Sequence, residues 1–325
     1  MRIVITGGAG FLGQRLARAI LEKGSTDRDG TQVSVDRLTL LDVVTANDFG
    51  DPRVESIAAD MTDRGVLERV FDAEVGGVFH LAAVVSGQAE ADFDLGMRVN
   101  FDATRLLLER LRHLGGGVRM VMTSSVAVFG GELPAVVPDN QVWAPQSSYG
   151  TQKAMADLLL SDYARKGFVD ARSVRLPTIV VRPGKPNLAA SSFASGIIRE
   201  PLQGQEAICP VVPETVLWLM SPRFVMKNLL HAFDLPAERL GNRRVINLPG
   251  LSIRVGDMIA ALQRAGASAP SLIRMQRDPA VERIVNSWPG NFSADYARQL
   301  GFTADIDFDS IIQAFIEDEK IAIAA

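Results

Sequence analysis

The sequence predicts an α/β fold in which helices cover both faces of a doubly wound parallel sheet, with a smaller, discontinuous lobe toward the C-terminus. Apolar, β-branched runs alternate with segments of helical periodicity up to residue 182, and this alternation is typical of a parallel sheet. A glycine-rich turn joins the first strand to the first helix. Beyond residue 183 prolines and glycines become frequent and the alternation is lost, which indicates a second, less regular unit.

Length and composition limit the classes of protein that the chain can be. With 325 residues, 47% hydrophobic and 22% charged, it suits a globular domain with a smaller lobe. The formal charge of -4 gives no reason to expect nucleic acid as a partner. The single cysteine, Cys209, and three scattered histidines predict neither disulfides nor a metal site. Apolar runs stay short of the ~18 residues of a membrane span, so we expect a cytoplasmic protein with a small-molecule partner.

The first strand, residues 3–6, leads into the pattern G-x-x-G-x-x-G and then into a helix over residues 14–23. Glycines at these positions allow a tight turn and let a pyrophosphate approach the N–H groups and the positive dipole end of the helix. Because the pattern lies between a strand and a helix, it predicts a Rossmann-type dinucleotide site. The cofactor-binding residues expected in this turn are Gly7, Gly10, Phe11, Leu12 and Gly13.

The ends of the next two strands are expected to contact the adenosine half of the cofactor. After a polar surface loop, the strand over residues 38–41 ends at Asp42. Its carboxylate can accept hydrogen bonds from the ribose and would repel a 2'-phosphate, so we expect NAD in preference to NADP. Asp60 and Met61 follow the third strand, residues 54–58, at the place where a side chain would meet the adenine.

The fourth strand, residues 75–81, ends in small residues that let a cofactor lie close to the sheet. The contacts expected there are Leu81, Ala82 and Ala83. The helix predicted over residues 97–113 is rich in leucine, and a fully solvated helix would not be. One of its sides is therefore expected to face a partner subunit.

Catalytic side chains are expected after the fifth strand. Ser125 follows that strand, residues 118–123, and Tyr149 begins the next helix four residues before Lys153. Residues at i and i+4 share a helix face, and a nearby cation lowers the pKa of a tyrosine from about 10, which makes the phenolate a usable base. The alternative is a surface tyrosine beside a solvated lysine. A sixth strand is predicted over residues 174–181.

As a set, the glycine turn, the acid after the second strand, the serines after the fifth strand and the Tyr-x-x-x-Lys helix resemble the extended short-chain dehydrogenase/reductase family. The resemblance covers nearly the whole chain and implies a nicotinamide cofactor with a catalytic group of Ser125, Tyr149 and Lys153. It implies that the tyrosine takes the proton of a substrate alcohol, the lysine lowers the tyrosine pKa and binds the nicotinamide ribose, and the serine holds the hydroxyl. Further cofactor contacts that it implies are Asn100, through water to the lysine, and Pro177 and Thr178, beside the nicotinamide amide.

The substrate lobe distinguishes groups within this family. Nucleotide-sugar epimerases and dehydratases typically carry an arginine-aspartate-tyrosine segment that grips phosphates, whereas this chain has Leu-Trp-Leu-Met-Ser-Pro-Arg over residues 217–223. Residues 146–153, 182–187 and 190–196 resemble instead the D-erythronate dehydrogenase group, which oxidises the C2 hydroxyl of a four-carbon sugar acid with NAD. Such a substrate needs a cation for its carboxylate and polar partners for its hydroxyls. The candidates are Arg182, Lys185, Asn187, Ser191 and Ser192, and the alternative for each is a residue of a solvated loop. Trp218 and Arg223 either close the pocket or are a packed tryptophan and a surface arginine.

Two alternative functions stay open from the sequence. One is a nucleotide-sugar 4-epimerase or dehydratase that keeps its NAD tightly bound, and the other, outside enzymes, is an NAD-binding sensor without catalysis. In either case we expect residues 1–182, with 216–248 returning, to form the NAD-binding domain, and residues 183–215 and 249–325 to form the substrate-binding lobe. The family resemblance also suggests a homodimer built from the helices at 97–113 and 149–166.

Overall fold

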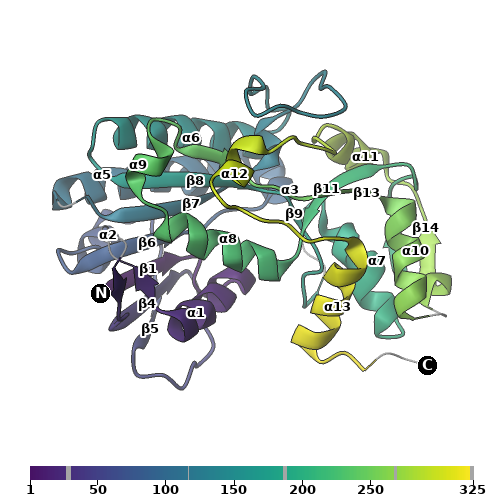
Figure 1. Ribbon diagram of the computed structural model, residues 1–325, viewed down its shortest axis with the longest axis horizontal. Coiled ribbons are helices and arrows are strands. Elements are labelled where there is room, and N and C mark those ends of the chain that lie inside the picture. The colour runs from purple at the N-terminus through teal and green to yellow at the C-terminus, as the bar shows by residue number, and fades with distance from the viewer. Residues whose placement is uncertain (27–30, 116, 186–188, 267–268, 323–325) are drawn as a thin grey trace.

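A parallel sheet of seven strands forms the centre of the computed structural model, which describes residues 1–26, 31–115, 117–185, 189–266 and 269–322. The strands lie in the order β12-β8-β7-β6-β1-β4-β5, and each neighbouring pair is parallel. The order reverses at β1, so a crevice opens at the carboxyl ends of β1 and β6. The predicted doubly wound α/β fold is thereby confirmed (Figure 1). The strands are β1 (Arg2–Thr6), β4 (Arg37–Asp42), β5 (Val54–Ala58), β6 (Val75–His80), β7 (Arg119–Ser125), β8 (Asp170–Leu176) and β12 (Val245–Asn247).

Helices cover both faces of this sheet (Figure 1). Alternate side chains of a strand point to opposite faces, so Ile3 and Ile5 of β1 belong to one apolar core and Val4 belongs to another. The first core is covered by α1 (Phe11–Lys23), α8 (Pro222–Asp234) and the short α12 (Asp295–Gln299). The second core is covered by α2 (Arg64–Val70), α5 (Ala103–Leu114) and α6 (Ser148–Arg165).

The leucine-rich helix is explained by this second core. Leu107, Leu108 and Leu111 of α5 are fully buried within the single chain. Their number therefore gives no argument for a partner subunit, contrary to our expectation, and a homodimer stays a prediction. The chain between β6 and α5 winds through α3 (Ser86–Ala91), α4 (Phe93–Gly96) and a π-helical turn, η1 (Met97–Asp102).

The lobe is built around a small mixed sheet with its own apolar core (Figure 1). In this sheet β11 pairs in parallel with β9 and antiparallel with β13, while β10 and β14 form a separate parallel pair. The elements are β9 (Thr178–Ile179), β10 (Ala207–Cys209), β11 (Val216–Met220), β13 (Leu251–Arg254), β14 (Ile273–Met275), α7 (Ser192–Leu202), α10 (Val255–Ala265), η3 (Ala269–Leu272), α11 (Pro279–Asn286) and α13 (Phe308–Glu319). Residues 216–248 are predicted to return to the NAD-binding domain. In the structure β11 lies in the lobe's sheet, whereas α8 packs against the central sheet and β12 is a strand of that sheet. The division into two units stays a prediction.

Two local predictions differ from the structure. The strand predicted over residues 174–181 is divided, because Pro177 cannot donate to a strand ladder: β8 ends at Leu176 in the central sheet, and β9 starts at Thr178 in the lobe. The divided strand carries the chain from one sheet to the other. The predicted polar loop contains a short hairpin, and a single 3-10 turn follows β7. These elements are β2 (Ser25–Thr26), β3 (Gln32–Val33) and η2 (Val126–Val128), and the remaining short helix is α9 (Ala237–Leu240).

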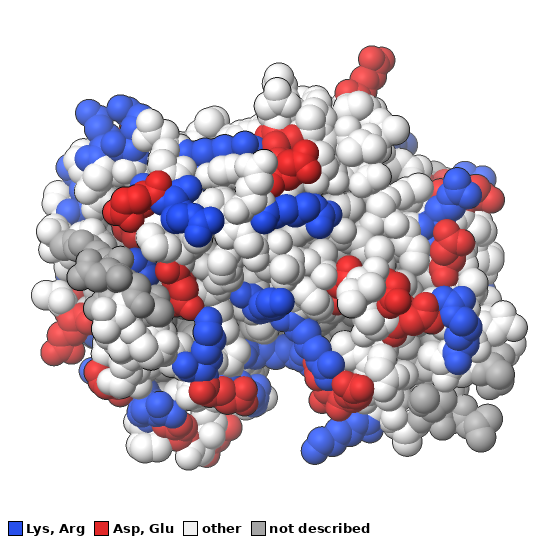
Figure 2. Space-filling model, viewed as in Figure 1, with Lys and Arg blue, Asp and Glu red and all other residues white. Residues whose placement is uncertain are grey.

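Ion pairs connect the last helix to the helices of the central sheet. Arg15 of α1 pairs with Asp318 at 2.8 Å and also with Glu319, and Arg223 of α8 pairs with Glu317 at 2.9 Å. Charged side chains border a notch at the lower edge of the molecule (Figure 2). The expectation that Arg223 closes the substrate pocket is therefore wrong, because its guanidinium lies in this surface cluster. Within the described ranges, every helix is too short or too polar to span a bilayer.

Candidate active site

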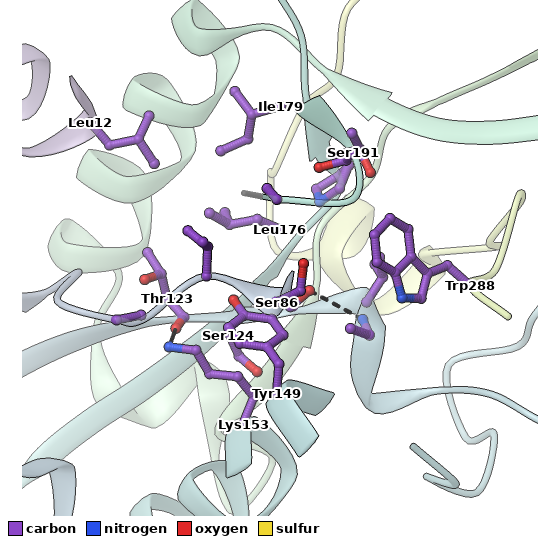
Figure 3. Close-up of a pocket in the computed structure, with 18 of the residues that line it drawn as sticks. Leu12, Ser86, Thr123, Ser124, Tyr149, Lys153, Leu176, Ile179, Ser191 and Trp288 are labelled. Carbon is purple, nitrogen blue, oxygen red and sulfur yellow. Dashed lines mark hydrogen bonds between the residues drawn. The ribbon is translucent and has the colours of Figure 1, made fainter. Parts of the chain in front are cut away.

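A cavity of about 250 Å³ lies where the carboxyl ends of the central strands meet the lobe. Its lining combines Leu12 at the start of α1, the end of β7, the first turns of α6 and residues of the lobe (Figure 3). Segments far apart in the chain are thus brought to one place, as the switch-point rule predicts. The predicted site residues that line it are Leu12, Leu81, Ala83, Ser125, Tyr149, Lys153, Pro177, Thr178, Arg182 and Ser191.

The glycine turn has the close packing that a dinucleotide site requires. A Cβ at Gly13 would lie 2.3 Å from the carbonyl oxygen of Gly7, so only glycine lets the start of α1 lie against the turn. Gly10, the N-cap of α1, donates its N–H to the same carbonyl at 3.1 Å. The turn leaves a bare backbone cradle at the N-terminus of a helix, which fits a pyrophosphate.

Asp42 lies beside this cradle. One carboxylate oxygen accepts a hydrogen bond from the Ala9 N–H at 3.1 Å, and the other accepts one from the Val43 N–H at 2.7 Å. The carboxylate is therefore held at the end of β4, next to the turn, where the adenosine ribose is expected. Asp60 is exposed beyond β5, whereas the Met61 side chain is 6% exposed and packs in the second core.

Tyr149 and Lys153 lie on the first two turns of α6. Ser147 caps this helix by accepting a hydrogen bond from the Gly150 N–H at 3.2 Å. A Cβ at Gly150 would lie 2.1 Å from the carbonyl oxygen of Ala127, so the glycine lets α6 press against the turn that follows β7. Tyr149 thereby lies next to the end of β7, with Lys153 below it (Figure 3).

Burial, not mutual attraction, controls the ionisation of this pair. Burial raises the pKa of Tyr149 to about 12, although a hydrogen bond with Ser125 lowers it in part. Burial also lowers the pKa of Lys153 to about 8, and the charge of Asp157 opposes that change. Lys153 Nζ donates to the Thr123 carbonyl oxygen at 3.0 Å and lies 5.8 Å from the Tyr149 ring centre. The expected lowering of the tyrosine pKa by the lysine is therefore wrong for this structure.

Asn100 is buried in the π-helical turn and joins two parts of the site. Its Nδ2 donates to Gln152 Oε1 at 2.8 Å, and its Oδ1 accepts the N–H of Val84 at 2.8 Å. The amide thus connects the chain beyond β6 with α6, one residue before Lys153. The implied contact with the lysine through water stays a prediction.

The substrate-lobe candidates separate into two groups. Arg182 and Ser191 line the cavity, and among the described residues Arg182 Nη2 has no hydrogen-bond partner although it is buried. Lys185 is exposed, and Ser192 lines a different surface pocket beside α7. Asn187 lies outside the described residues.

Trp288 is a lining residue that sequence reasoning missed. It follows α11, and its side chain lies across the cavity from Leu12 (Figure 3). The tryptophan expected to close the pocket, Trp218, is 4% exposed and packs in an apolar cluster with Phe292 instead. Nothing in the local sequence distinguishes the two tryptophans, because the difference depends on how the lobe folds.

Comparison with known proteins places the chain in a family. A family model described as the NAD dependent epimerase/dehydratase family matches residues 3–218. Two proteins named D-erythronate dehydrogenase match over nearly their whole length. The one from Cupriavidus necator is 57% identical over 99% of this chain and 100% of its own, and the one from Haemophilus influenzae is 47% identical over 98% and 99%.

Solved structures agree with the fold. A protein from Agrobacterium tumefaciens, named a nucleoside-diphosphate-sugar epimerase, is 45% identical with a TM-score of 0.93, over 98% of this chain and 94% of its own. L-Threonine 3-dehydrogenase from Trypanosoma brucei is 27% identical with a TM-score of 0.85, over 98% and 96%. The chain belongs to the NAD dependent epimerase/dehydratase family, which confirms the predicted extended short-chain dehydrogenase/reductase resemblance and NAD as cofactor.

Proposed function

We propose that this protein oxidises the C2 hydroxyl of D-erythronate with NAD to give 2-oxo-tetronate. The names of the relatives from Cupriavidus necator and Haemophilus influenzae support this activity. The observation that carries the proposal to the site is Arg182, which lines the cavity together with Ser125 and Tyr149 and whose Nη2 has no partner among the described residues. A sugar acid offers this arginine the carboxylate that it lacks.

The energetics of burial favour an anion beside Arg182. Burial and the neighbouring Arg199 both lower the pKa of Arg182, and a buried donor of a charged group that has no hydrogen-bond partner is unfavourable. Arginine binds carboxylates through charge-assisted, often bidentate hydrogen bonds. Ser191 lines the same cavity and is our candidate for a substrate hydroxyl. Lys185 and Ser192 stay predicted contacts of lower weight, because they do not line this cavity.

We assign the cofactor to the carboxyl ends of β1, β4 and β6. The glycine turn would hold the pyrophosphate and Asp42 the adenosine ribose. The strand ends with Leu81, Ala82 and Ala83, and the lobe entry with Pro177 and Thr178, would flank the remainder. When bound, NAD supplies the hydride acceptor.

The residues of the chain have separate roles in the proposed oxidation. Ser125 holds the C2 hydroxyl, Tyr149 accepts its proton while the hydrogen on C2 leaves as hydride, and Lys153 binds the nicotinamide ribose. The alcohol thus loses one proton and one hydride and becomes a ketone. Ser125 and Tyr149 both line the cavity, and Ser125 lies close enough to lower the pKa of Tyr149 in part, so both can reach one hydroxyl.

A nucleotide-sugar epimerase is the second candidate, and the name of the Agrobacterium tumefaciens structure favours it. One observation argues against it for this chain. Arg223 is the cation of residues 217–223, the segment compared with the phosphate-gripping one, and it is paired with Glu317 and Asp318 at the surface. A homodimer and a cytoplasmic location stay predictions of the sequence.

Paired variants test the proposed carboxylate contact. Arg182→Gln should raise the KM for D-erythronate by about tenfold or more, since a hydrogen bond to a charged group contributes roughly 1.5–3 kcal/mol. Lys185→Gln tests the competing candidate on the same loop, and because Lys185 is exposed, the KM of this variant should rise less than that of Arg182→Gln. If the KM rose more for Lys185→Gln than for Arg182→Gln, the substrate carboxylate would bind at Lys185 and not at Arg182.

A further inference from the structure

A buried ion pair lies between helix α6 and the central sheet, and it takes no part in the chemistry described above. Asp157 of α6 is 0% exposed and Arg175 of β8 is 2% exposed, and Arg175 Nε lies 2.9 Å from Asp157 Oδ2. The same carboxylate accepts hydrogen bonds from the hydroxyls of Ser124 at 2.9 Å and Ser173 at 2.6 Å. One carboxylate therefore joins α6 to β7 and β8.

Arg175 also holds the segment that connects β7 to α6. Its guanidinium carbon lies 3.9 Å from the centre of the Trp143 ring and 5.0 Å from that of Phe129. These two rings belong to residues 126–147, the segment between Ser125 and the catalytic helix. The guanidinium is thus packed against both ends of the segment that links the catalytic side chains.

Stability alone gives a poor reason for such a pair. Taking two charges out of water costs about as much as their attraction returns, and apolar replacements of similar volume are often neutral or stabilising. A hydrogen-bonded pair is directional, however, and fixes the elements that it joins in one arrangement. Ser124 precedes Ser125, and Asp157 lies about one helical turn after Lys153.

We propose that Asp157 and Arg175 are positioning residues: without touching the substrate, the pair holds the end of β7 and the first turns of α6 so that Ser125, Tyr149 and Lys153 meet in one geometry. This inference rests on the proposed oxidation for its catalytic readout. Figure 3 shows Ser124, the link to this pair, beside Tyr149 and Lys153.

The charge of the pair has a second effect on the site. Lys153 is faced by Tyr149 and Asp157 from α6 and by His80 from β6, and Arg175 of β8 lies behind Asp157. The pKa of His80 is lowered to about 3 by burial, so it is neutral at physiological pH. The negative charge of Asp157 raises the pKa values of both Tyr149 and Lys153. Removing that charge should therefore lower both pKa values together.

Asp157→Asn tests the proposal because it keeps the shape of the side chain and removes its charge. The kcat should fall by about tenfold or more while KM for D-erythronate changes by less than about threefold. The pH dependence of kcat should move to lower pH by roughly half a unit or more. Asp162→Asn is the control on the same helix: Asp162 is exposed and pairs with Arg165, and its replacement should leave the pH profile in place.

A second variant is needed because breaking a buried ion pair is strongly destabilising, so that Asp157→Asn could lose activity by unfolding. Asp157→Leu combined with Arg175→Met removes both charges and should fold, as judged by its melting temperature, with the same loss of kcat. Ser124→Ala keeps the ion pair and deletes one of its hydrogen bonds, and should lower kcat by about threefold with the pH profile unmoved. If the folded variants turn over normally and their pH profiles coincide with that of the unaltered protein, the positioning role is wrong. Normal turnover by Ser124→Ala alone would overturn it even if the other two variants fail to fold.

A titration separates this inference from the proposed substrate. The chain has three tyrosines, so ultraviolet absorbance of tyrosinate, compared with that of Tyr149→Phe, reports Tyr149 directly. Asp157→Asn should ionise Tyr149 at lower pH whatever the substrate is. A shifted titration with no erythronate activity in the unaltered protein would reject the substrate and keep the role of Asp157, whereas an unshifted titration would reject the role of the charge.

Discussion

At the scale of residues, burial sets the ionisation of the catalytic pair. Tyr149 and Lys153 lose more hydration than they gain from neighbouring charges, so the pKa of Tyr149 rises to about 12 and that of Lys153 falls to about 8. Near neutral pH the tyrosine keeps its proton and most of the lysine is charged. Because proton acceptance needs the phenolate, the rate of oxidation should rise as the pH increases above neutrality.

Tyr149→Phe tests the assignment of the base. The variant keeps the ring and removes the hydroxyl, so kcat should fall by roughly 10² to 10⁴, while the Kd for NAD stays within a few-fold. Steady-state kinetics and a titration with NAD measure the two quantities. Turnover close to that of the unaltered protein would mean that another group accepts the proton.

His80 gives a prediction about stability. Its ring contacts the hydroxyls of Thr6 at 2.7 Å and Thr104 at 2.9 Å, and burial lowers its pKa to about 3 from 6.5. The unfolded chain binds a proton below pH 6.5 that the folded chain does not, so stability falls as the pH drops from 6.5 toward 3. We expect the free energy of unfolding, measured with urea, to fall between pH 7 and about pH 4.5 in both proteins. The fall should be about 3 kcal/mol larger for the unaltered protein than for His80→Asn. Equal losses would show that His80 is not buried as a neutral ring.

At the scale of elements, the strand ends were predictable because the rule that governs them is local. Each parallel strand ends at the same edge of the sheet, so the order of strands in the sequence was enough to bring Asp42, Ser125 and Tyr149 to one side. Leu81 and Lys153 line the cavity together with Ser125 and Tyr149. These positions follow from periodicity and from glycine spacing, both of which can be read within about 20 residues.

The lobe was less predictable because its pairing is not local. β9, β11 and β13 are separated by long stretches of chain, and nothing in their short apolar runs specifies the partner. For the same reason Lys185 and Arg182, three residues apart, could not be distinguished from the sequence. Trp288 reaches the cavity only through the folding of the lobe.

The end of β4 gives a prediction about cofactor choice. Asp42→Ala removes a carboxylate that is held beside the glycine turn, and with it the repulsion of a 2'-phosphate. The ratio of kcat/KM for NADP to that for NAD should rise by about tenfold or more, which corresponds to roughly 1.4 kcal/mol. Asp48→Ala, in the exposed loop that follows β4, is the control. An unchanged ratio would remove Asp42 from the ribose site.

At the scale of the whole molecule, the cavity is closed by the lobe. The central sheet and its helices carry the glycine turn and the proposed catalytic group, whereas Arg182, Ser191 and Trp288 come from the chain beyond β8. The divided strand at Pro177 connects the two parts. We therefore expect the lobe to limit the size of the substrate, and the sheet with its helices to supply the catalytic side chains.

Trp288 offers a test of this separation. Trp288→Ala should lower kcat/KM for D-erythronate. The ratio of kcat/KM for a five-carbon sugar acid to kcat/KM for D-erythronate should rise by about tenfold or more, because one carbon in a pocket changes kcat/KM by roughly 10 to 200-fold. Trp288→Phe should be intermediate. An unchanged preference for chain length would mean that Trp288 does not limit the substrate.

The central claim is most directly tested by NADH formation with purified protein and NAD, offered D-erythronate, L-threonine and UDP-glucose in parallel. The account predicts NADH with D-erythronate, little with L-threonine, and no interconversion of UDP-glucose. If D-erythronate gave no NADH, while L-threonine gave NADH or the sugar nucleotide was epimerised, the account would be contradicted.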